Sequence, residues 1–361
     1  MPKTVLLGDV VTIQSGKSRP SSSGEYPVYG GNGISNYADD YNISEPTVIV
    51  GRVGAYCGSV YIERNNFWLS DNALGLTARE GTDLKYLYYL LKHQDLNKRS
   101  VGGAQPLLTQ GILNNISVTL PDVGTQKEIA KILGDLDIKI ELNRRMNETL
   151  EKIGQALFKH YFIDSPDRKN WERQPLSTFG QVVCGKTPPK TNKEFFGGNV
   201  PFIKIPDMHG QTFITETQDS LSEKGRDYQD NKIIPPYSLC VSCIATVGLV
   251  SITALSSQTN QQINSIVPAK NYSIFYLYFQ LKNLKDELVN RASSGSATPN
   301  MNTSTFSKIK ISSPNQKTFQ GFDDVARPLF QRILTNQNEN KNLVLLRDSL
   351  LPRLISGKVG I

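Results

Sequence analysis

Two cysteines with metal-ligand spacing are the first residues whose types could support chemistry. Cys240 and Cys243 form a lone CxxC inside Leu239 to Val250, a run that predicts a buried strand. Side chains three positions apart on a strand face opposite sides, and the sequence has no second CxxC or histidine pair to complete a zinc site. We therefore expect packed thiols rather than a metal centre, and no disulfide if the protein is cytoplasmic.

Three other segments imitate catalytic motifs. Gly16-Lys17-Ser18 looks like the end of a P-loop, but Val11 stands where the first glycine of that motif belongs. Ile234-Pro235-Pro236-Tyr237 is similar to the Asn/Asp-Pro-Pro-Tyr signature of amino-methyltransferases, but an isoleucine replaces the polar residue that would hold the target amino group. That segment predicts a turn into the next strand. Asp137-Ile138-Lys139 loosely resembles a nuclease carboxylate–lysine pattern, but it lies on a predicted long helix, where charges form a solvated face.

The remaining chemistry-bearing residues suggest no active site. The three histidines, His93, His160 and His209, are scattered, and no nucleophile stands beside a base. At 361 residues the chain predicts two or more domains. Lys and Arg number 40 against 33 Asp and Glu, and the resulting net charge of +7 permits a nucleic-acid partner without requiring one. No apolar run approaches the ~18 residues of a membrane span, and the start does not resemble a signal peptide. We therefore expect a cytoplasmic protein without a membrane partner.

The elements that would position any site occur twice. Gly102 to Pro106 matches Gly295 to Pro299 at an offset of 193 residues, and the same offset carries Asn143 onto Asn336. A unit repeated once, with each copy ending in a long helix, predicts a molecule with approximate two-fold symmetry. Duplex DNA has the same symmetry, which makes it a candidate partner.

Upstream of these segments the offset between the copies is smaller. Val10 to Lys17 matches Phe179 to Lys186, and Val48 to Gly54 is set against Cys240 to Thr246. Short β-branched runs broken by Gly, Asn and Pro predict strands joined by turns. Loops of different length explain the changing offset, because loops vary while the scaffold is kept.

Two long helices are predicted, from Thr125 to Phe162 and from about Lys317 to Ile355, because apolar residues recur there with heptad spacing. They could pack on separate domains, or on each other as a coiled coil. Asn143 and Asn336 favour the coiled coil, since each interrupts the centre of its own apolar seam. A chain ordered domain–helix–domain–helix with two-fold symmetry requires an antiparallel pair. We therefore expect Asn143 and Asn336 to meet across it. The fold class is α+β, with two β-rich domains separated by two long antiparallel helices.

Several segments resemble type I restriction-modification specificity subunits. Gln126 to Asn143 resembles the first conserved helix of that family, as does its end, Ala156 to Phe162. Leu350 to Lys358 looks like the C-terminal signature of the family. Val241 to Gly248 and Thr259 to Asn264 resemble its target recognition domains. The first half matches least well, because Ser-Asp-Asn at 70–72 replaces the Asn-Gln-Gln run of 260–262.

This resemblance implies a DNA specificity subunit that catalyses nothing itself. Target recognition domains at residues 1–122 and 164–316 would each bind half of an asymmetric, bipartite DNA site. Long helices at 123–163 and 317–361 would separate them and dock two methyltransferase subunits. Those partners use S-adenosylmethionine to methylate adenine, and restriction subunits join to cleave DNA with ATP. Magnesium is also expected on the partners, and no cofactor or metal on this chain.

Base readout requires side chains that reach groove edges, with basic residues on phosphates. The polar, Gly-rich loops around Gly103 and Gly295 are favoured, because they recur at equivalent places in both copies. The candidates in the first domain are Lys17, Arg19, Asn32, Arg52, Tyr56, Arg64, Asn65 and Gln105. The candidates in the second domain are Lys186, Lys190, Lys193, Lys204, Thr246, Gln261, Gln262, Ser296, Thr298 and Asn300.

Two rival functions make different predictions. A scaffold that binds another protein through its β-rich modules would show no salt-dependent, sequence-selective DNA binding. A methyltransferase fused to its own specificity domain would need a cofactor-binding glycine motif, which the sequence lacks.

Overall fold

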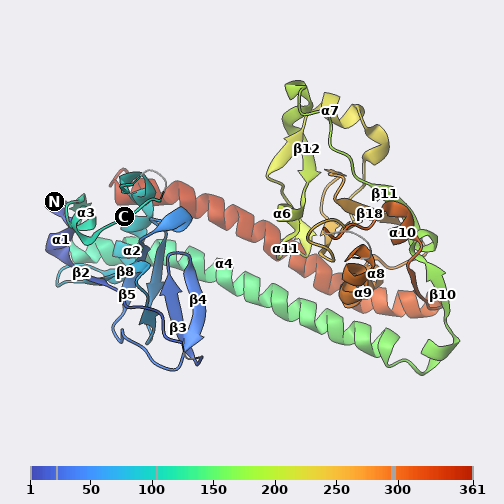
Figure 1. Ribbon diagram of the computed structural model, residues 1–361, viewed down its shortest axis with the longest axis horizontal. Helices are drawn as coiled ribbons and strands as arrows, with labels where there is room; N and C mark the ends of the chain where they lie inside the picture. Colours follow the sequence, from blue (N-terminus) through green and yellow to red (C-terminus); the bar gives the residue numbers. More distant parts are fainter. Residues whose placement is uncertain (1, 22, 103–104, 294–297, 360–361) are drawn as a thin grey trace. The chain divides into compact units, whose positions relative to one another are not determined.

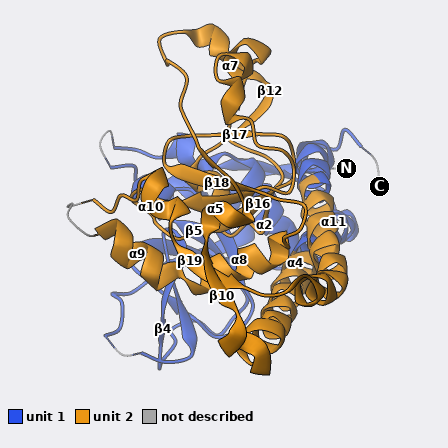
Figure 2. Cartoon of the chain, turned by 90° about the vertical axis from the view of Figure 1, so that its right-hand side faces the viewer, with its two compact units in different colours: residues 1–140, 342–361 blue, residues 141–341 orange. Residues whose placement is uncertain are grey.

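The computed structural model describes residues 2–21, 23–102, 105–293 and 298–359. The chain forms two compact units, one of residues 1–140 with 342–361 and the other of residues 141–341 (Figure 2). Each unit combines a β-rich body with one segment from each of two long helices, α4 (Val123–Phe158) and α11 (Gln316–Ile355) (Figure 1). In the described part of the chain, no helix is both long enough and apolar enough to cross a membrane.

Unit 1 is built around an antiparallel sheet with strand order β2-β8-β5-β6. A second sheet, β4-β3-β7, joins an antiparallel hairpin to a short parallel strand, and β1 pairs with β9. The strands are β1 (Lys3–Leu6), β2 (Val11–Ser15), β3 (Tyr26–Gly30), β4 (Gly33–Ala38), β5 (Thr47–Gly51), β6 (Val60–Glu63), β7 (Trp68–Leu69), β8 (Ala73–Ala78) and β9 (Ser117–Leu120). The shorter helices are α1 (Leu7–Val10), η1 (Gly54–Tyr56), α2 (Leu84–His93), η2 (Leu96–Arg99) and α3 (Gln110–Asn114).

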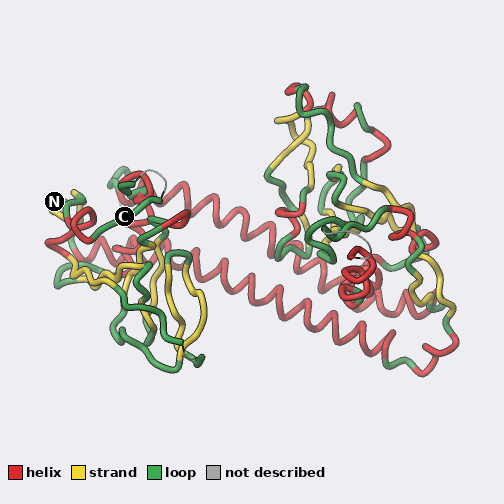
Figure 3. The backbone as a smooth tube through the Cα atoms, in the orientation of Figure 1, coloured by secondary structure: helices red, strands yellow, loops and turns green. Residues whose placement is uncertain are grey.

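Unit 2 repeats this plan with one additional strand, β13, at the edge of its main sheet, β11-β18-β15-β16-β13. In both units strands and loops make up the body beside the long helical segments (Figure 3). Its other sheets are β14-β12-β17 and the pair β10-β19. The strands are β10 (Glu172–Pro175), β11 (Gly180–Cys184), β12 (Phe196–Ile203), β13 (Phe213–Ile214), β14 (Asp219–Leu221), β15 (Leu239–Ser242), β16 (Val250–Thr253), β17 (Gln258–Thr259), β18 (Ile263–Pro268) and β19 (Lys310–Ser313). The shorter helices are η3 (Lys159–Ile163), η4 (Pro166–Asn170), α5 (Leu176–Phe179), η5 (Lys193–Phe195), α6 (Ile205–Met208), α7 (Glu223–Asp227), η6 (Asp230–Lys232), α8 (Ile274–Asn283), α9 (Lys285–Ser293) and α10 (Thr303–Ser307).

Helix caps confirm the repeat at the level of single residues. The side chain of Asp83 accepts a hydrogen bond from the third residue of α2, and Ser273 does the same for α8. Asp122 accepts from the backbone N–H of Thr125, as Asn315 accepts from Thr318. These residues satisfy N–H groups that a helix start leaves unpaired. The offset is therefore 190 residues between α2 and α8, and 193 between the long helices.

The strand registers correct one predicted match by a single residue. Val48 of β5 pairs with Leu76, and Leu239 of β15 pairs with Ile266 at the matching position of β18. Val48 therefore corresponds to Leu239, and not to Cys240 as the sequence comparison assumed. Both strands are buried on both faces, so the residues do not alternate between apolar and polar in a way that would fix the register.

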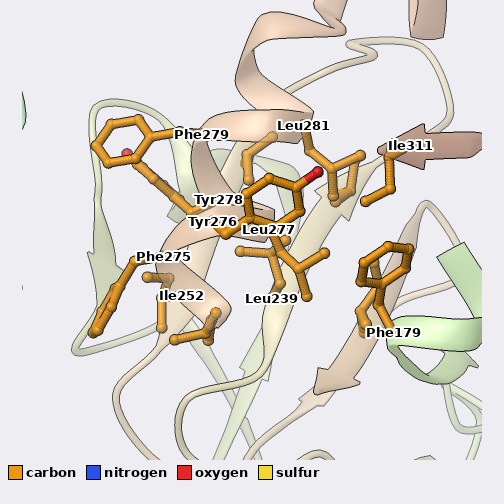
Figure 4. Packing of buried hydrophobic residues seen from close by; sticks show 14 of the residues in the cluster. Phe179, Leu239, Ile252, Phe275, Tyr276, Leu277, Tyr278, Phe279, Leu281 and Ile311 are labelled. Atoms are coloured by element: carbon orange, nitrogen blue, oxygen red, sulfur yellow. The ribbon is translucent and has the colours of Figure 1, made fainter. Parts of the chain in front are cut away.

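Each unit buries parts of both long helices in its own core. In unit 2, Phe275 of α8 stacks on Phe330 of α11 with ring centroids 4.4 Å apart, while Phe279 lies 5.8 Å from Phe158 of α4. Leu239 and other sheet residues close the opposite side of the same cluster (Figure 4). The core of unit 1 likewise joins α2 and the sheet to buried residues of α4 and α11. Neither β-rich body is complete without the helices.

The long helices run antiparallel within each unit, as predicted. In unit 1, Asp137 of α4 accepts a hydrogen bond of 2.8 Å from Arg347 of α11. In unit 2, Asn143 donates to Asn340 at 2.9 Å, and farther along α4 Phe158 packs near Phe322. Residue numbers rise along one helix as they fall along the other.

The predicted contact between Asn143 and Asn336 is wrong by one helical turn on each side. Asn143 donates to Glu339 as well as to Asn340, whereas Asn336 donates to Asn147 at 2.8 Å. Both asparagines are buried, so their positions in the seam were read correctly. Heptad spacing places a residue in the seam but leaves the axial stagger open, and the stagger depends on how each body packs on the helices.

The two asparagines should differ in their contribution to stability. Asn143→Leu would remove two hydrogen bonds, one to a half-buried carboxylate and one to an amide, at a cost of about 1–3 kcal/mol. Asn336→Leu loses one hydrogen bond but also removes a buried Oδ1 that has no partner, so its cost should stay below about 1 kcal/mol. Urea unfolding of both variants, with exposed Asn338→Leu as control, measures the difference. An equal or larger loss for Asn336→Leu would contradict this account.

Candidate nucleic-acid interface

In unit 1 the predicted contact residues converge on loops joined by backbone hydrogen bonds. The N–H of Lys17 donates to the Leu69 carbonyl at 3.0 Å. The N–H of Arg52 donates to Asn72 at 2.9 Å, and the N–H of Gly54 donates to the Pro106 carbonyl at 3.1 Å. Segments far apart in the sequence thus form one loop cluster. We call it the first loop face, and its residues are 16–19, 30–32, 52–56, 70–72 and 105–107.

Unit 2 builds the same arrangement from the same bonds. Lys186 donates to Thr259 at 2.9 Å, Cys243 to Gln262 at 2.8 Å, and Ala245 to Pro299 at 3.0 Å, all through backbone N–H groups. We call this the second loop face, with residues 185–187, 243–248, 260–262 and 298–300. Because each bond has its counterpart in unit 1, the two faces share a backbone but carry different side chains.

A glycine fixes the closest approach in each loop face. A Cβ atom at Gly16 would overlap the backbone carbonyl of Ser70, and one at Gly185 would overlap the carbonyl of Asn260. The loops can therefore pack this tightly only where a side chain is missing. The Gly-Lys pair that imitates a P-loop in the sequence has this structural role.

Six of the eight predicted residues of the first domain lie at the first loop face. Lys17, Arg19, Asn32, Tyr56 and Gln105 are exposed there, and Arg52 is half-buried. The buried Nε of Arg52 has no hydrogen-bond partner among the described residues.

The other two, Arg64 and Asn65, lie elsewhere. They follow β6, whose last residue, Glu63, pairs with Thr47 at the opposite end of β5 from the loop face. Glu63 also accepts hydrogen bonds from the backbone of both residues. The structure therefore does not bring Arg64 and Asn65 together with the other candidates.

The second loop face contains most of the predicted residues of its domain. Lys186, Thr246, Gln261, Gln262, Thr298 and Asn300 lie on it. Gln261 accepts a hydrogen bond of 2.7 Å from Thr187, and the Nζ of Lys186 lies 5.7 Å from the centre of the Tyr228 ring. Ser296, like Gly103 and Gly295, falls outside the described residues.

The three other lysines of the second domain have different surroundings. Lys190 and Lys193 are exposed in the segment that precedes β12, and neither forms an ion pair with a described carboxylate. Lys204 is half-buried and ion-paired with Asp219. Lys190 and Lys193 are therefore the freer cations for a polyanionic ligand.

Sequence reasoning missed three residues of the loop faces. Asp71 and Asn72 occupy the positions that correspond to Gln261 and Gln262, because the N–H groups of Ala73 and Ile263 donate equivalent turn bonds to the carbonyls of Ser70 and Asn260. Thr187 was also missed, although it holds Gln261 in place. Asp71 and Asn72 could have been found from the Ser-Asp-Asn run at 70–72, which stands where the second half has Asn-Gln-Gln.

The segments that imitate catalytic motifs have structural roles. Ile234 is buried and pairs with Ser257, so its segment forms the turn into β15 as predicted. Cys240 and Cys243 are buried thiols in separate apolar clusters. Burial raises the pKa of the Cys240 thiol to about 12 and that of Cys243 to about 11. Among the described residues, no group of three or more His, Cys, Asp or Glu side chains could hold a metal.

Comparison with known proteins adds independent information. The family model for the type I restriction modification DNA specificity domain matches residues 3–152 and 168–341. The HindI specificity subunit of Haemophilus influenzae is 41% identical, with 72% of each chain covered. The MjaIX specificity subunit of Methanocaldococcus jannaschii is 27% identical, with 84% of this chain and 76% of the relative covered. The crystal structure of the S subunit from M. genitalium has the same fold, with a TM-score of 0.67 at 17% identity over 98% of this chain and 96% of that one.

Gly185→Ala should disturb the second loop face, because the added methyl group would overlap a backbone carbonyl. A backbone carbonyl cannot rotate away as the end of a flexible side chain can. We expect the midpoint of urea unfolding to fall, corresponding to a loss of about 1–3 kcal/mol. Gly111→Ala is the matched control, since its nearest atom would be 3.8 Å away. Equal stability of the two variants would show that the approach at residue 185 is not tight.

Proposed function

This chain belongs to the type I restriction-modification DNA specificity family, and from that membership we propose that it reads an asymmetric, bipartite DNA target and catalyses nothing itself. Each β-rich body acts as one target recognition domain, residues 1–122 and 164–316, and binds one half of the target through its loop face. The helices between and after them dock two methyltransferase subunits, and restriction subunits join that complex.

The observation that carries this proposal is the pair of loop faces with one backbone and two sets of side chains. Arg52 stands where the second face has Cys243, and Asp71 stands where it has Gln261. Arginine donates to guanine edges, carboxylates accept from cytosine, and glutamine suits adenine. Two faces with different donors and acceptors should read different bases, which makes the target asymmetric.

Exposed apolar residues on the long helices support two equivalent docking places. Ile132 and Val325 are exposed at matching positions of α4 and α11, and so are Ile153 and Leu346. Each unit therefore presents one residue of each matched pair, Ile132 with Leu346 in unit 1 and Val325 with Ile153 in unit 2. Repeated apolar positions suit two copies of one partner, because exposed apolar residues gain from burial in an interface.

Lys190 and Lys193 should contribute to affinity rather than to sequence preference. Changing Lys190 and Lys193 to Gln removes up to two phosphate contacts, so log Kd should depend less steeply on log salt, with a slope smaller by up to about two. Gln261→Ala should instead relax the preference at one base position. Fluorescence anisotropy with target and scrambled duplexes measures both effects, and Lys310→Gln on β19, which removes one exposed charge of the same domain, is the control. The absence of any salt-dependent DNA binding would favour the protein-scaffold alternative.

A domain exchange tests the assignment of one domain to one half-site. Residues 171–313 are replaced by the matching domain of a relative, and the full chain is assembled with its methyltransferase subunits. Mapping methylated adenines should show one half-site changed, with the other half-site and the spacer unchanged. The chain without those subunits serves as control and should transfer no methyl groups from S-adenosylmethionine. A change in both half-sites, or in the spacer alone, would refute the assignment.

A further inference from the structure

Helices α2 and α8 are equivalent in the repeat, and each rests on the two long helices of its own unit. Their contact residues nevertheless differ in chemical type at matching positions. We propose that these differences restrict each recognition domain to the helix surface of its own unit. The contacts therefore determine which of the two domains comes first along the chain.

In unit 1 the contact is polar. The Tyr89 hydroxyl of α2 donates to Asp137 of α4 at 2.6 Å, and Arg347 of α11 donates to the other oxygen of the same carboxylate at 2.8 Å. One turn earlier on α2, Lys85 lies against Gly134, where a Cβ atom would overlap the end of the lysine side chain. We call these five residues the α2 contact set.

In unit 2 the contact is formed mainly by aromatic rings. Phe275 stacks on Phe330 at 4.4 Å between ring centroids, and Phe279 lies 5.6 Å from the same ring. A Cβ atom at Gly154 would lie 2.7 Å from Cζ of Phe279, so only glycine leaves room for that ring. The guanidinium of Arg327 lies 5.6 Å from the centre of the Phe275 ring. We call these five residues the α8 contact set.

Each residue of one set matches a residue of the other set. The offsets are those given by the helix caps, 190 residues between α2 and α8 and 193 residues between the long helices. Phe275 and Phe279 replace Lys85 and Tyr89 on the domain helix. On the long helices, Arg327 replaces Gly134, Phe330 replaces Asp137, and Gly154 replaces Arg347. In each set a glycine of α4 faces a large side chain of the domain helix, but the two glycines do not stand at matching positions of the repeat.

Each domain would meet a mismatch on the surface of the other. The first domain placed on the unit 2 surface would bring Lys85 to Arg327, which is a repulsion between like charges. It would also bury the Tyr89 hydroxyl against Phe330 without a partner, and a buried unpaired hydroxyl is costly. The second domain placed on the unit 1 surface would bring Phe279 to Asp137. That carboxylate would then lose the hydrogen bond from the tyrosine, one of the two described above, while it stays partly buried.

One further contact distinguishes the unit 2 surface. Glu151 of α4 accepts hydrogen bonds of 3.0 Å from Tyr278 and 3.1 Å from Thr212, and it pairs with Lys282. Val344 occupies the matching position of the unit 1 surface. The second domain would therefore also lose its carboxylate partner there.

The contact sets predict which domains from relatives each surface accepts. The unit 1 surface fits a domain whose helix carries a lysine and, four residues later, a tyrosine. The unit 2 surface fits a domain with phenylalanine at both positions. Proteins usually discriminate between two partners in this way, through favourable contacts with one and mismatched contacts with the other.

A cycle of full-length variants tests the coupling without any assumption about function. The first variant gives α2 the α8 residues, Lys85→Phe with Tyr89→Phe. The second gives the unit 1 surface its counterpart residues, Gly134→Arg, Asp137→Phe and Arg347→Gly. The third combines all five substitutions, and His93→Phe on an exposed position of α2 is the control. Thermal unfolding is followed by circular dichroism.

We expect each partial variant to lower the unfolding midpoint by roughly 4 °C or more, and the combined variant to recover at least half of the summed loss. Coupling of this kind is expected between residues that touch or share one network, and not between distant, independent sites. If the losses add in the combined variant, the two sides of the contact are independent and the proposal is wrong. If either partial variant fails to fold, recovery of a folded chain in the combined variant supports the proposal, and its continued failure overturns it.

A second experiment links the contact sets to target order, and this part rests on the proposed function. Residues 3–120 are replaced by a second copy of residues 172–313, once on the native unit 1 surface and once on a converted surface. The converted surface carries Gly134→Arg, Asp137→Phe, Val344→Glu and Arg347→Gly. Both chains are assembled with methyltransferase subunits, and methylated adenines are mapped.

We expect only the chain with the converted surface to fold fully and to direct methylation to two inverted copies of the second half-site. If the chain with the converted surface folds but still directs methylation to the original target, the proposal about the contact sets stands and the proposed function is wrong. Equal folding of both chains would overturn the contact sets, whatever the target.

Discussion

Neither long helix can bury its apolar face alone, and the rest of the structure depends on how that face is covered. Each unit solves the problem with three helices and a sheet, because one segment of α4, one segment of α11 and one domain helix share a single core. The β-rich bodies in turn lack part of their own core without the helices. A helix this long is stable in water mainly through such packing rather than through intrinsic propensity. The helices are therefore part of each folded unit and not a linker between units.

The sequence predicted the elements whose apolar residues recur periodically or whose segments are repeated along the chain. It left open how elements with uniformly apolar residues are matched. Heptad spacing identified both long helices, and the 193-residue offset placed Asn143 and Asn336 in equivalent buried positions. The stagger of the helices was wrong, because it depends on the aromatic packing around Phe158 and Phe330, which no periodicity encodes. The match of Val48 to Cys240 was wrong by one residue for a related reason, since a strand buried on both faces has no alternation to count.

The loop faces show a similar limit. Residues such as Lys17 and Lys186 could be singled out from their types and from the repeat. Their convergence with Leu69 and Thr259, 52 and 73 positions away, depends on backbone hydrogen bonds, which leave no mark on residue type. Arg64 and Asn65 had suitable side chains but lie at the other end of their strand. Asn72 was overlooked because it differs from Gln262, although the same bond holds both loops.

The backbone bonds within the loop faces also have an evolutionary consequence. Arg52 and Cys243 form equivalent backbone bonds. Each donates its N–H to the other loop of its face, and each carbonyl accepts a bond, from Leu108 in the first face and from Met301 in the second. Their side chains nevertheless have nothing in common. The backbone bonds at this position thus form with a half-buried arginine as well as with a buried cysteine. A single codon change there can alter the groups shown to a ligand without breaking a bond that shapes the loop. Variation in what each face recognises can therefore accumulate by point mutation, one position at a time, on a scaffold that does not have to be rebuilt.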